Sequence, residues 1–266
     1  MTVRGISGLL TRQGAILAVA AVVAAAIGGG TALALTASAS SHVVSMSRGD
    51  RTSAALKMTA GTPFLDISVG KLGGTLMRVS TPDDAPVRPV LSGSAAAVIV
   101  LSLTGASATG TSATGDSAIG GRGHARGAGY AVKVVLNSAV TWSLDLAGGT
   151  QRTEADLRGG KVGGIAVTAG SDVLDVSLPR PAGTLPFLLA GGVSRFLLSL
   201  PGGVPAQVTV GGGASFVSVD DQNLTGVAGG TVLTPPSWAA ARSRFDIDAT
   251  SGFSRLTVSR WSTAGS

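Results

Sequence analysis

The chain has 266 residues, enough for one sizeable hydrophobic core, and its 40 glycines and few aromatic residues mean that Val, Leu, Ile and Ala must build that core. The absence of cysteine excludes disulfide bonds, thiolate nucleophiles and cysteine-based zinc sites. The formal charge of +6 comes from scattered basic residues rather than from the basic and aromatic clusters of a nucleic-acid groove, so we expect no nucleic-acid partner.

The first notable element is an apolar segment at residues 13–37, which carries no charge. As a helix, 22 of these residues span about 33 Å, which is enough to cross a bilayer. Arg4 and Arg12 precede the segment. The positive-inside rule therefore predicts a cytoplasmic tail at 1–12, a single-pass anchor in the cytoplasmic membrane at 13–37, and an exported remainder.

A cleaved signal peptide is the alternative interpretation of this segment. The unbroken apolar run from Ala15 to Ile27 has the length of a signal-peptide core, and small residues at 32–34 and 37–39 offer cleavage sites. The β region is outside the cytoplasm under both interpretations, either anchored or secreted. Residues 38–54 are small and polar, and predict a tether between membrane and domain.

The exported β domain is expected at residues 55–261, with a short tail at 262–266. Alternating apolar and polar residues predict its early strands at Thr75–Ser80, Pro86–Leu91, Ala95–Leu103 and Tyr130–Leu136. Residues 104–129 are mostly Gly, Ser, Ala and Thr. Such residues bury too little surface to offset the entropy of ordering, so they predict a mobile hairpin loop.

One pattern then recurs along the chain, with apolar residues five and three places before a glycine and four and six places after it. The six central glycines are Gly61, Gly149, Gly170, Gly192, Gly213 and Gly252. The four from Gly149 to Gly213 are 21, 22 and 21 residues apart. Alternation on both sides of a glycine predicts strand, tight bend, strand, with the glycine supplying a positive φ. Each copy is then a β-arc or a hairpin.

A unit of this length cannot bury its apolar face alone, so neighbouring copies must cover it. The predicted fold class is therefore all-β, a stacked, solenoid-like antiparallel β array that follows one N-terminal transmembrane helix. An ordinary β-sandwich with periodic strand spacing is the alternative. The residues expected to line one interior are Leu174, Val176, Phe196, Leu198, Val217 and Val219.

Near the C-terminus, Thr231–Arg242 contains two prolines and predicts a turn with at most one turn of helix. The three tryptophans, Trp142, Trp238 and Trp261, lie at strand ends or in this turn. They could form a surface that stacks on a ligand. We expect them to fill the core instead, because large apolar residues usually do.

Familiar catalytic motifs are sparse. The two histidines, His42 in the tether and His124 in the loop, lack the rigid setting of a general base or metal ligand. Ser68 and Lys71 match the S-x-x-K motif, but they end a predicted strand instead of starting a helix. We therefore expect no catalytic, cofactor-binding or metal-binding residues, and no enzymatic activity.

Carboxylates are the remaining candidates for chemistry. They occur as four close pairs: Asp83 with Asp84, Asp172 with Asp175, Asp220 with Asp221, and Asp246 with Asp248. Paired carboxylates serve glycosidases and calcium sites. Turn positions and solvated strand faces explain these pairs more simply. The alternative is an enzyme that acts on envelope glycan through a pair such as Asp172 and Asp175.

Four stretches carry a family resemblance: WSLDLAGG, GSDVLDVSLPRPAGTLPF, GGVSRFLLSLPGGVPAQVTVGGGASFVSV and RFDIDATSGFSRLTVSRW. Through them, residues 55–261 resemble actinobacterial membrane proteins similar to the putative-adhesin and cell-wall-stress-response families. The resemblance implies a toast-rack fold, which is a stacked antiparallel β array, an envelope location, and a role in surface interaction or stress signalling. Residues 104–129 depart from it as an insertion.

The function expected from the sequence is that of a non-enzymatic, membrane-tethered β domain outside the cytoplasmic membrane. It acts as a binding or scaffold module for an envelope protein or a wall polymer, and needs no cofactor. A self-associating structural protein, forming homo-oligomers, is a further alternative. Exposed edge strands without protection would favour that alternative.

Overall fold

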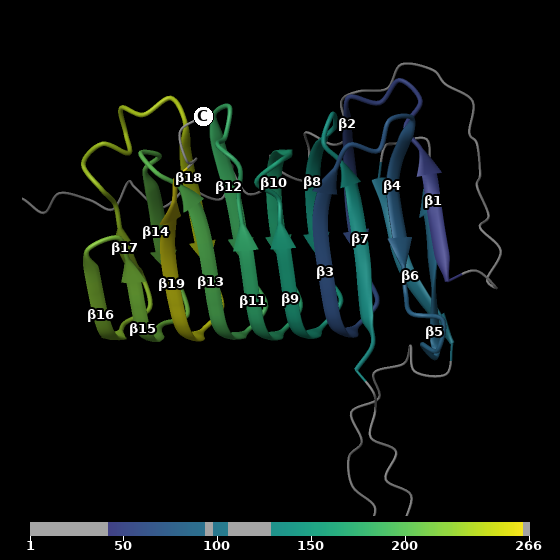
Figure 1. The fold of residues 1–266 in the computed structure, drawn as a ribbon. Coiled ribbons are helices and arrows are strands. Elements are labelled where there is room, and N and C mark those ends of the chain that lie inside the picture. The colour runs from purple at the N-terminus through teal and green to yellow at the C-terminus, as the bar shows by residue number, and fades with distance from the viewer. Residues whose placement is uncertain (1–41, 94–97, 106–128, 263–266) are drawn as a thin grey trace, which may run out of the picture.

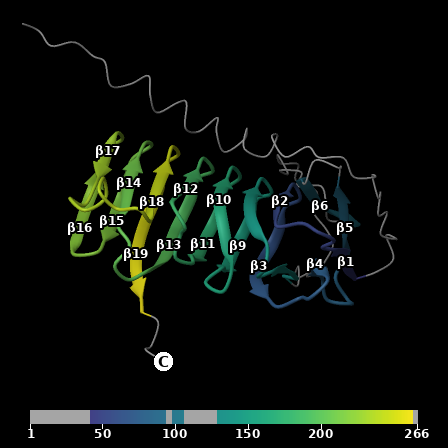
Figure 2. The same ribbon diagram turned by 90° about the horizontal axis from the view of Figure 1, so that it is seen from above.

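The computed structural model describes residues 42–93, 98–105 and 129–262. In this part of the chain nineteen strands form two sheets, of ten and nine strands, and there is no α-helix. Figure 1 shows the ten-stranded sheet A in front of the nine-stranded sheet B, and Figure 2 shows the two layers from above. The all-β prediction is confirmed for these residues.

The strands of sheet A follow an order different from their order in the chain. They are β1 (Val43–Ser47), β4 (Thr75–Ser80), β7 (Ala131–Asn137), β3 (Thr62–Gly70), β9 (Thr150–Asp156), β11 (Ser171–Ser177), β13 (Val193–Pro201), β19 (Phe253–Trp261), β15 (Ala214–Val219) and β16 (Gln222–Val227).

Sheet B is arranged in the same manner. Its strands, from the end beside β16, are β17 (Thr231–Leu233), β14 (Ala206–Val210), β18 (Arg244–Ala249), β12 (Thr184–Leu189), β10 (Lys161–Val167), β8 (Thr141–Leu146), β2 (Ser53–Met58), β6 (Val98–Gly105) and β5 (Val87–Gly93).

All six predicted glycine copies are strand–bend–strand units. In each, a strand of sheet B leads through the glycine into a strand of sheet A, as β12 leads through Gly192 into β13. We call such a unit a rung, and the six bends lie along the lower edge of Figure 1, the glycine edge. The two strands of a rung face each other across the core, so each copy is a β-arc and not a hairpin.

The prediction of an antiparallel array is wrong for the stacked rungs. Strands of neighbouring rungs pair in parallel, as β11 does with both β9 and β13. Copies that stack facing the same way place each strand beside its equivalent, which runs in the same direction. Antiparallel pairs occur at the two ends of the stack, for example β1 with β4 and β15 with β16.

The rungs do not stack in chain order. The last rung, β18 and β19, lies between the β12–β13 rung and the β14–β15 rung. The first rung, β2 and β3, lies between β8–β9 and β6–β7. At that end of the stack β1 contacts β5 and draws the two sheets together, which covers the terminal rung.

Neighbouring bends approach most closely at the residue before the bend glycine, since a Cβ atom on the bend glycines Gly149, Gly170 and Gly192 would meet the next backbone only at ordinary contact distances of 3.4–4.0 Å. Of the six bend glycines only Gly213 has a positive φ, of 81°, so the predicted reason for glycine is wrong at the other five. A Cβ atom on Gly191 would lie 2.0 Å from the carbonyl oxygen of Ala169, and one on Gly148 1.9 Å from that of Ala60. Glycine is typical where one backbone packs against another in this way.

The position before each bend glycine also shows a pattern along the stack. In spatial order these residues are Ala60, Gly148, Ala169, Gly191, Ser251 and Gly212, so a small side chain alternates with glycine. Backbone hydrogen bonds follow the same edge, because Thr150 N–H donates to the Gly170 carbonyl and Ser171 N–H to the Gly192 carbonyl. Each bend is thereby fixed to the next.

The hydrophobic core lies between the sheets. The residues predicted to line it are buried, with exposures from 0 to 7%: Leu174, Val176, Phe196, Leu198, Val217 and Val219. Phe187 of sheet B and Phe196 of sheet A meet across the interior, with ring centroids 5.1 Å apart. Apolar burial is thus continuous along the stack, as a repeat architecture requires.

The tether predicted at residues 38–54 is partly wrong, because residues 43–47 form strand β1 and residues from Ser53 onward form β2. Val44 and Met46 of β1 are buried while Val43, Ser45 and Ser47 are exposed. This period-two pattern is the signal of a strand, and the small polar composition around it concealed the signal.

The predicted hairpin loop at residues 104–129 is wrong in one respect. The strands on either side of residues 104–129, β6 and β7, lie in different sheets, so the segment does not close a hairpin. Residues 106–128 and the predicted anchor at 13–37 lie outside the described residues. The described part of the chain holds no helix that could span a membrane.

In the C-terminal turn, Thr231–Leu233 forms β17, a strand that the sequence analysis did not predict.

A core truncation tests the inward face. Leu198→Ala is expected to lower the free energy of unfolding by about 2–5 kcal/mol, because it removes a fully buried side chain and leaves a cavity. Chemical denaturation measures the change. A cost near zero would contradict the assigned core.

A glycine substitution tests the glycine edge. Gly191→Ala is expected to destabilise the fold by about 1–3 kcal/mol, because the new methyl group collides with the Ala169 backbone. Gly183→Ala is the matched control, since its Cβ meets no atom within 4 Å at an ordinary φ. The control is expected to be neutral or to stabilise by about 0.4–1 kcal/mol. Equal effects of the two substitutions would refute the close-approach explanation.

Candidate functional site

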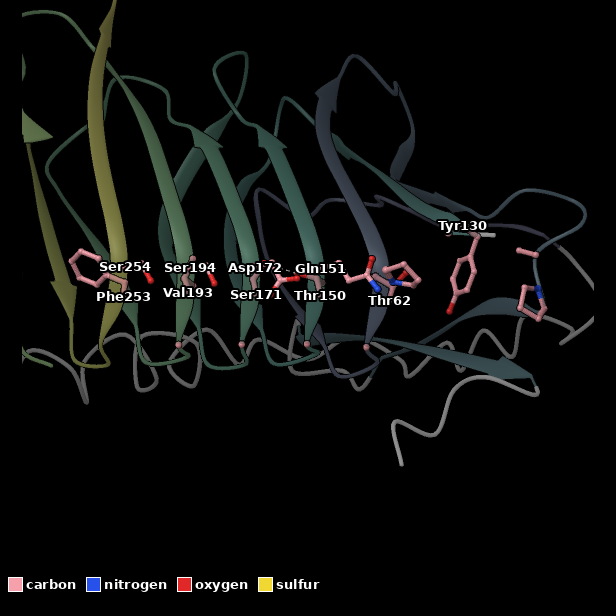
Figure 3. A pocket seen from close by; sticks show the side chains of 18 of the residues that line it. Thr62, Tyr130, Thr150, Gln151, Ser171, Asp172, Val193, Ser194, Phe253 and Ser254 are labelled. Carbon is pink, nitrogen blue, oxygen red and sulfur yellow. Dashed lines mark hydrogen bonds between the residues drawn. The ribbon is translucent and has the colours of Figure 1, made fainter. Parts of the chain in front are cut away.

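A long groove follows the outside of the glycine edge. Its volume is about 1270 Å³, and Figure 3 shows its side chains in a row across the first residues of the sheet A strands, just above the bends. The lining consists mainly of five of the six bend glycines, all but Gly213, and the two residues after each of them. Those labelled in Figure 3 are Thr62, Tyr130, Thr150, Gln151, Ser171, Asp172, Val193, Ser194, Phe253 and Ser254.

Three of the sheet A strands that line the groove, β9, β13 and β19, begin with the same break in alternation. In β13, Val193 is buried, Ser194 and Arg195 are both exposed, and Phe196 is buried again. A regular strand would turn successive residues to opposite faces. In these three strands the two successive exposed residues put the second residue in the groove and the third on the adjoining outer face of sheet A, whereas the third residue of β11, Val173, is buried.

A chain of hydroxyl groups fixes the middle of the groove. Thr150 Oγ1 lies 2.8 Å from Thr153 Oγ1 and donates to Ser171 Oγ over 2.9 Å. Ser171 Oγ in turn donates to the carbonyl of Val173 over 2.9 Å. The Ser171 proton therefore points to a backbone carbonyl and not to a base, which is the arrangement of a structural hydroxyl rather than an activated nucleophile.

Tyr130 stands at one end of the groove, beyond Thr62 in Figure 3. Burial raises the pKa of its phenol, and a side-chain hydrogen bond with Thr62 opposes that rise. The phenol is therefore protonated at neutral pH and can donate a hydrogen bond. Asp84 also lines the groove, together with Ala85 and Pro86, so of the Asp83–Asp84 pair only Asp84 belongs to the groove.

The pair Asp172 and Asp175 does not form one site. Asp172 lines the groove, whereas Asp175 lies further along β11 on the outer face of sheet A and is absent from the described lining. Burial, and next the charge of Glu154, raise the pKa of Asp175, while Arg152 opposes the rise. The carboxylate that lines the groove, Asp172, is therefore not the carboxylate whose pKa is raised, Asp175.

The true neighbours of Asp175 come from other rungs. Glu154 is in register with Asp175 on one side and with Asp66 on the other, so three carboxylates follow one another across β11, β9 and β3. The sequence analysis missed this row. All three occupy the fifth place after a bend glycine, and that shared repeat position was the signal that could have found them.

The other two acidic pairs have structural roles. Asp220 has a φ of 52° and accepts two hydrogen bonds from Arg260, at 2.6 and 2.9 Å, which hold its pKa below the usual range. Asp221 follows it in the turn before β16. Asp246 and Asp248 are half-exposed on sheet B between buried core residues, as the sequence predicts.

The remaining polar candidates do not converge on the groove. His42 Nδ1 lies 3.1 Å from Thr81 Oγ1 beside β1, so this histidine is held in place, while His124 lies outside the described residues. Ser68 lies near the end of strand β3, and Lys71 follows that strand, so no helix start is present there. The described residues contain no group of three or more His, Asp or Glu side chains that could hold a metal ion.

The tryptophans do not share a ligand-stacking surface. Trp142 is a core residue, 1% exposed, with its indole N–H donating to the Asn137 carbonyl. Trp238 is half-buried, donates to the Phe245 carbonyl, and lies under the Arg244 guanidinium. The Trp261 indole donates to the Leu178 carbonyl. The core prediction is confirmed for Trp142 only.

Comparison with known proteins supports the fold. No family model matches the chain, and no curated protein sequence matches it. The crystal structure of a putative cell adhesion protein from Clostridium sporogenes is similar, with a TM-score of 0.58 and 15% sequence identity over 85% of this chain and 99% of that one. An identity this low shows a shared fold alone, so the chain has an adhesin-like fold.

The acidic row generates a pH-dependent prediction. Because the pKa of Asp175 is raised in the folded chain, its ionised form destabilises the fold above that pKa, and the penalty disappears as the pH falls to the ordinary value of 3.8. Asp175→Asn is expected to raise the Tm at pH 7 by roughly 1–3 °C, and the gain should shrink on acidification. Asp172→Asn is the control for loss of an exposed carboxylate. A lower Tm in the Asp175→Asn variant, or a gain independent of pH, would contradict the assignment.

Proposed function

We propose that this chain is a non-enzymatic binding module of the cell envelope, and that the groove on its glycine edge binds a linear polymer. The observation that carries the proposal is the continuity of the groove across five neighbouring rungs, from β3 through β9, β11 and β13 to β19. A pocket for a small molecule is compact and mostly apolar. This groove is elongated, and its lining combines glycines and a few apolar residues with a row of small polar side chains.

The spacing of the rungs suits a repeating ligand. Neighbouring strands lie about 4.8 Å apart, so the five rungs offer equivalent positions over roughly 19 Å. Thr150, Gln151, Ser194 and Ser254 provide hydroxyl and amide groups along that length. Hydroxyl and amide groups each donate and accept hydrogen bonds, which fits the hydroxyl-rich repeat units of a wall polymer.

The groove chemistry supports binding over catalysis. Ser171 donates to a backbone carbonyl, and Asp175, whose pKa is raised, belongs to the outer face of sheet A. A glycan hydrolase needs two carboxylates on opposite sides of one bond. Asp172 is the carboxylate in the middle of the groove, and no second one adjoins it in the described lining.

The proposed location is outside the cytoplasmic membrane. The charge-free segment at 13–37 and the arginines before it support an anchored or a secreted domain. The fold likeness to a protein described as a putative cell adhesion protein is consistent with display at a cell surface. The proposed partners are therefore the membrane, through the N-terminal segment, and a wall polymer, through the groove.

Blocking the groove tests the proposal. Ser194→Trp places an indole in the groove at an exposed position, so the full-length chain should keep its Tm but lose at least about tenfold in affinity for purified cell walls. Ala182→Trp, exposed in the turn between β11 and β12 at the opposite edge, is the control and should bind like wild type. Co-sedimentation of the detergent-purified chain with cell walls measures both.

Three results would count against the proposal: no binding of the wild type to walls, unchanged binding of the Ser194→Trp variant, or equal losses in the two variants. The double variant Asp172→Asn, Asp175→Asn separates binding from catalysis in cells. A binding module should still complement a deletion strain under wall-active antibiotics, whereas an enzyme that depends on these carboxylates should lose about 10²-fold or more in rate.

A further inference from the structure

Charge is divided along the outer face of sheet A. The acidic row of Asp66, Glu154 and Asp175 lies on β3, β9 and β11. The next two strands, β13 and β19, contain no carboxylate, and each carries an arginine at the third place after its bend glycine, Arg195 and Arg255. The carboxylates of this face are thus confined to β3, β9 and β11, where Lys133 and Arg152 are their basic neighbours, while β13 and β19 carry arginine without a carboxylate.

The two arginines are direct neighbours. The parallel register of β13 and β19 places Arg195 opposite Arg255, on strands about 4.8 Å apart. Their register neighbours on the far sides are Val173 and Phe216, so no carboxylate flanks the pair within that row. Like charges placed directly opposite each other repel, so an anion bound between the two guanidinium groups would reduce their mutual repulsion.

The guanidinium groups are available for a ligand. The Arg195 side chain is exposed and makes no hydrogen bond or ion pair with any described residue. Arg255 lies over the ring of Phe216, with Cζ 4.6 Å from the ring centroid, which orients the guanidinium without using its N–H donors. Arg152, the equivalent residue on β9, differs because it is paired with Glu154 at 2.5 Å.

The arginine pair adjoins the groove. Ser194 and Ser254, the residues directly before the arginines, line the groove and point along the row in Figure 3. Two guanidinium groups and two hydroxyls therefore border the β13–β19 part of the groove. All four groups donate hydrogen bonds, so this part of the surface favours an anion.

We propose, on the basis of the groove function proposed above, that Arg195 and Arg255 form an anion subsite for the phosphate groups of a phosphodiester-linked polymer. A guanidinium fork binds phosphate or carboxylate through two parallel hydrogen bonds. A planar carboxylate satisfies one fork. A phosphate carries oxygens on all sides of the phosphorus, so it can accept from both forks and from the adjacent serine hydroxyls. The uncharged units of the polymer then lie over Thr150 and Gln151.

The test measures binding of the full-length, detergent-purified chain to defined probes. These are poly(glycerol phosphate), polyglutamate, a neutral chitin oligosaccharide, and vesicles of phosphatidylglycerol in phosphatidylcholine. Wild type should bind poly(glycerol phosphate) most tightly, with an affinity that falls as salt rises, because salt screens exposed charges. Equal or tighter binding of polyglutamate, or of the phosphatidylglycerol vesicles, would overturn the assignment to a phosphodiester polymer.

Matched variants locate the subsite. Arg195→Gln with Arg255→Gln should reduce poly(glycerol phosphate) affinity by at least about tenfold, since each charged hydrogen bond lost is worth roughly that factor. Arg152→Gln, which removes a paired arginine in the same row, should change it less than about threefold. Arg195→Lys with Arg255→Lys keeps the charge without the forks, and should restore part of the affinity. Unchanged binding in the glutamine double variant at an unchanged Tm would refute the subsite.

The same variants separate this inference from the proposed function. If the glutamine double variant binds purified walls like wild type while Ser194→Trp does not, the groove function stands and the anion subsite is refuted. If the wild type binds neither walls nor any probe, both proposals fail. Loss of wall binding in both variants, with Arg152→Gln unaffected, supports both.

Discussion

The close approach of neighbouring bends along the glycine edge is the constraint on which the rest of the structure depends. At Gly148 and Gly191 a single methyl group would lie 2 Å or less from the carbonyl oxygen of the adjacent bend. The alternation of glycine with Ala or Ser before each bend allows the rungs to stack at strand spacing. The parallel pairing and the continuous core need rungs at this spacing, so both are compatible with the contact that the small residues permit.

The groove is a consequence of the same edge. Because the bends stack in line, the second residues of β3, β9, β11, β13 and β19 lie side by side, and residues as distant in sequence as Thr62 and Ser254 line one surface. Insertion of the last rung between two earlier ones leaves this line intact, since each rung carries the same bend. The repeat that builds the core thus also presents a row of polar side chains along the groove, which is the property a linear ligand would use.

The sequence predicts those features that depend on residues close together in the chain. The period around each glycine predicted the strand–bend–strand units and the inward side chains, such as Leu174 and Phe196, since alternation decides which face is buried. It did not predict the direction of pairing or the order of rungs, because the same pattern suits a parallel or an antiparallel neighbour. The acidic row joins Asp66 to residues almost 90 or more positions away, and only the topology brings them together. The pairing of Arg195 with Arg255 has the same origin.

The central claim is that the glycine edge binds a linear wall polymer through its groove. The most direct measurement places a photo-crosslinking amino acid at position 194 of the full-length chain in living cells, with position 182 at the opposite edge as the comparison. After irradiation, the wall is digested enzymatically and the adducts are separated by mass. The account predicts polymer adducts at position 194 and none at position 182. Adducts of equal yield at both positions, or at position 182 alone, would contradict it.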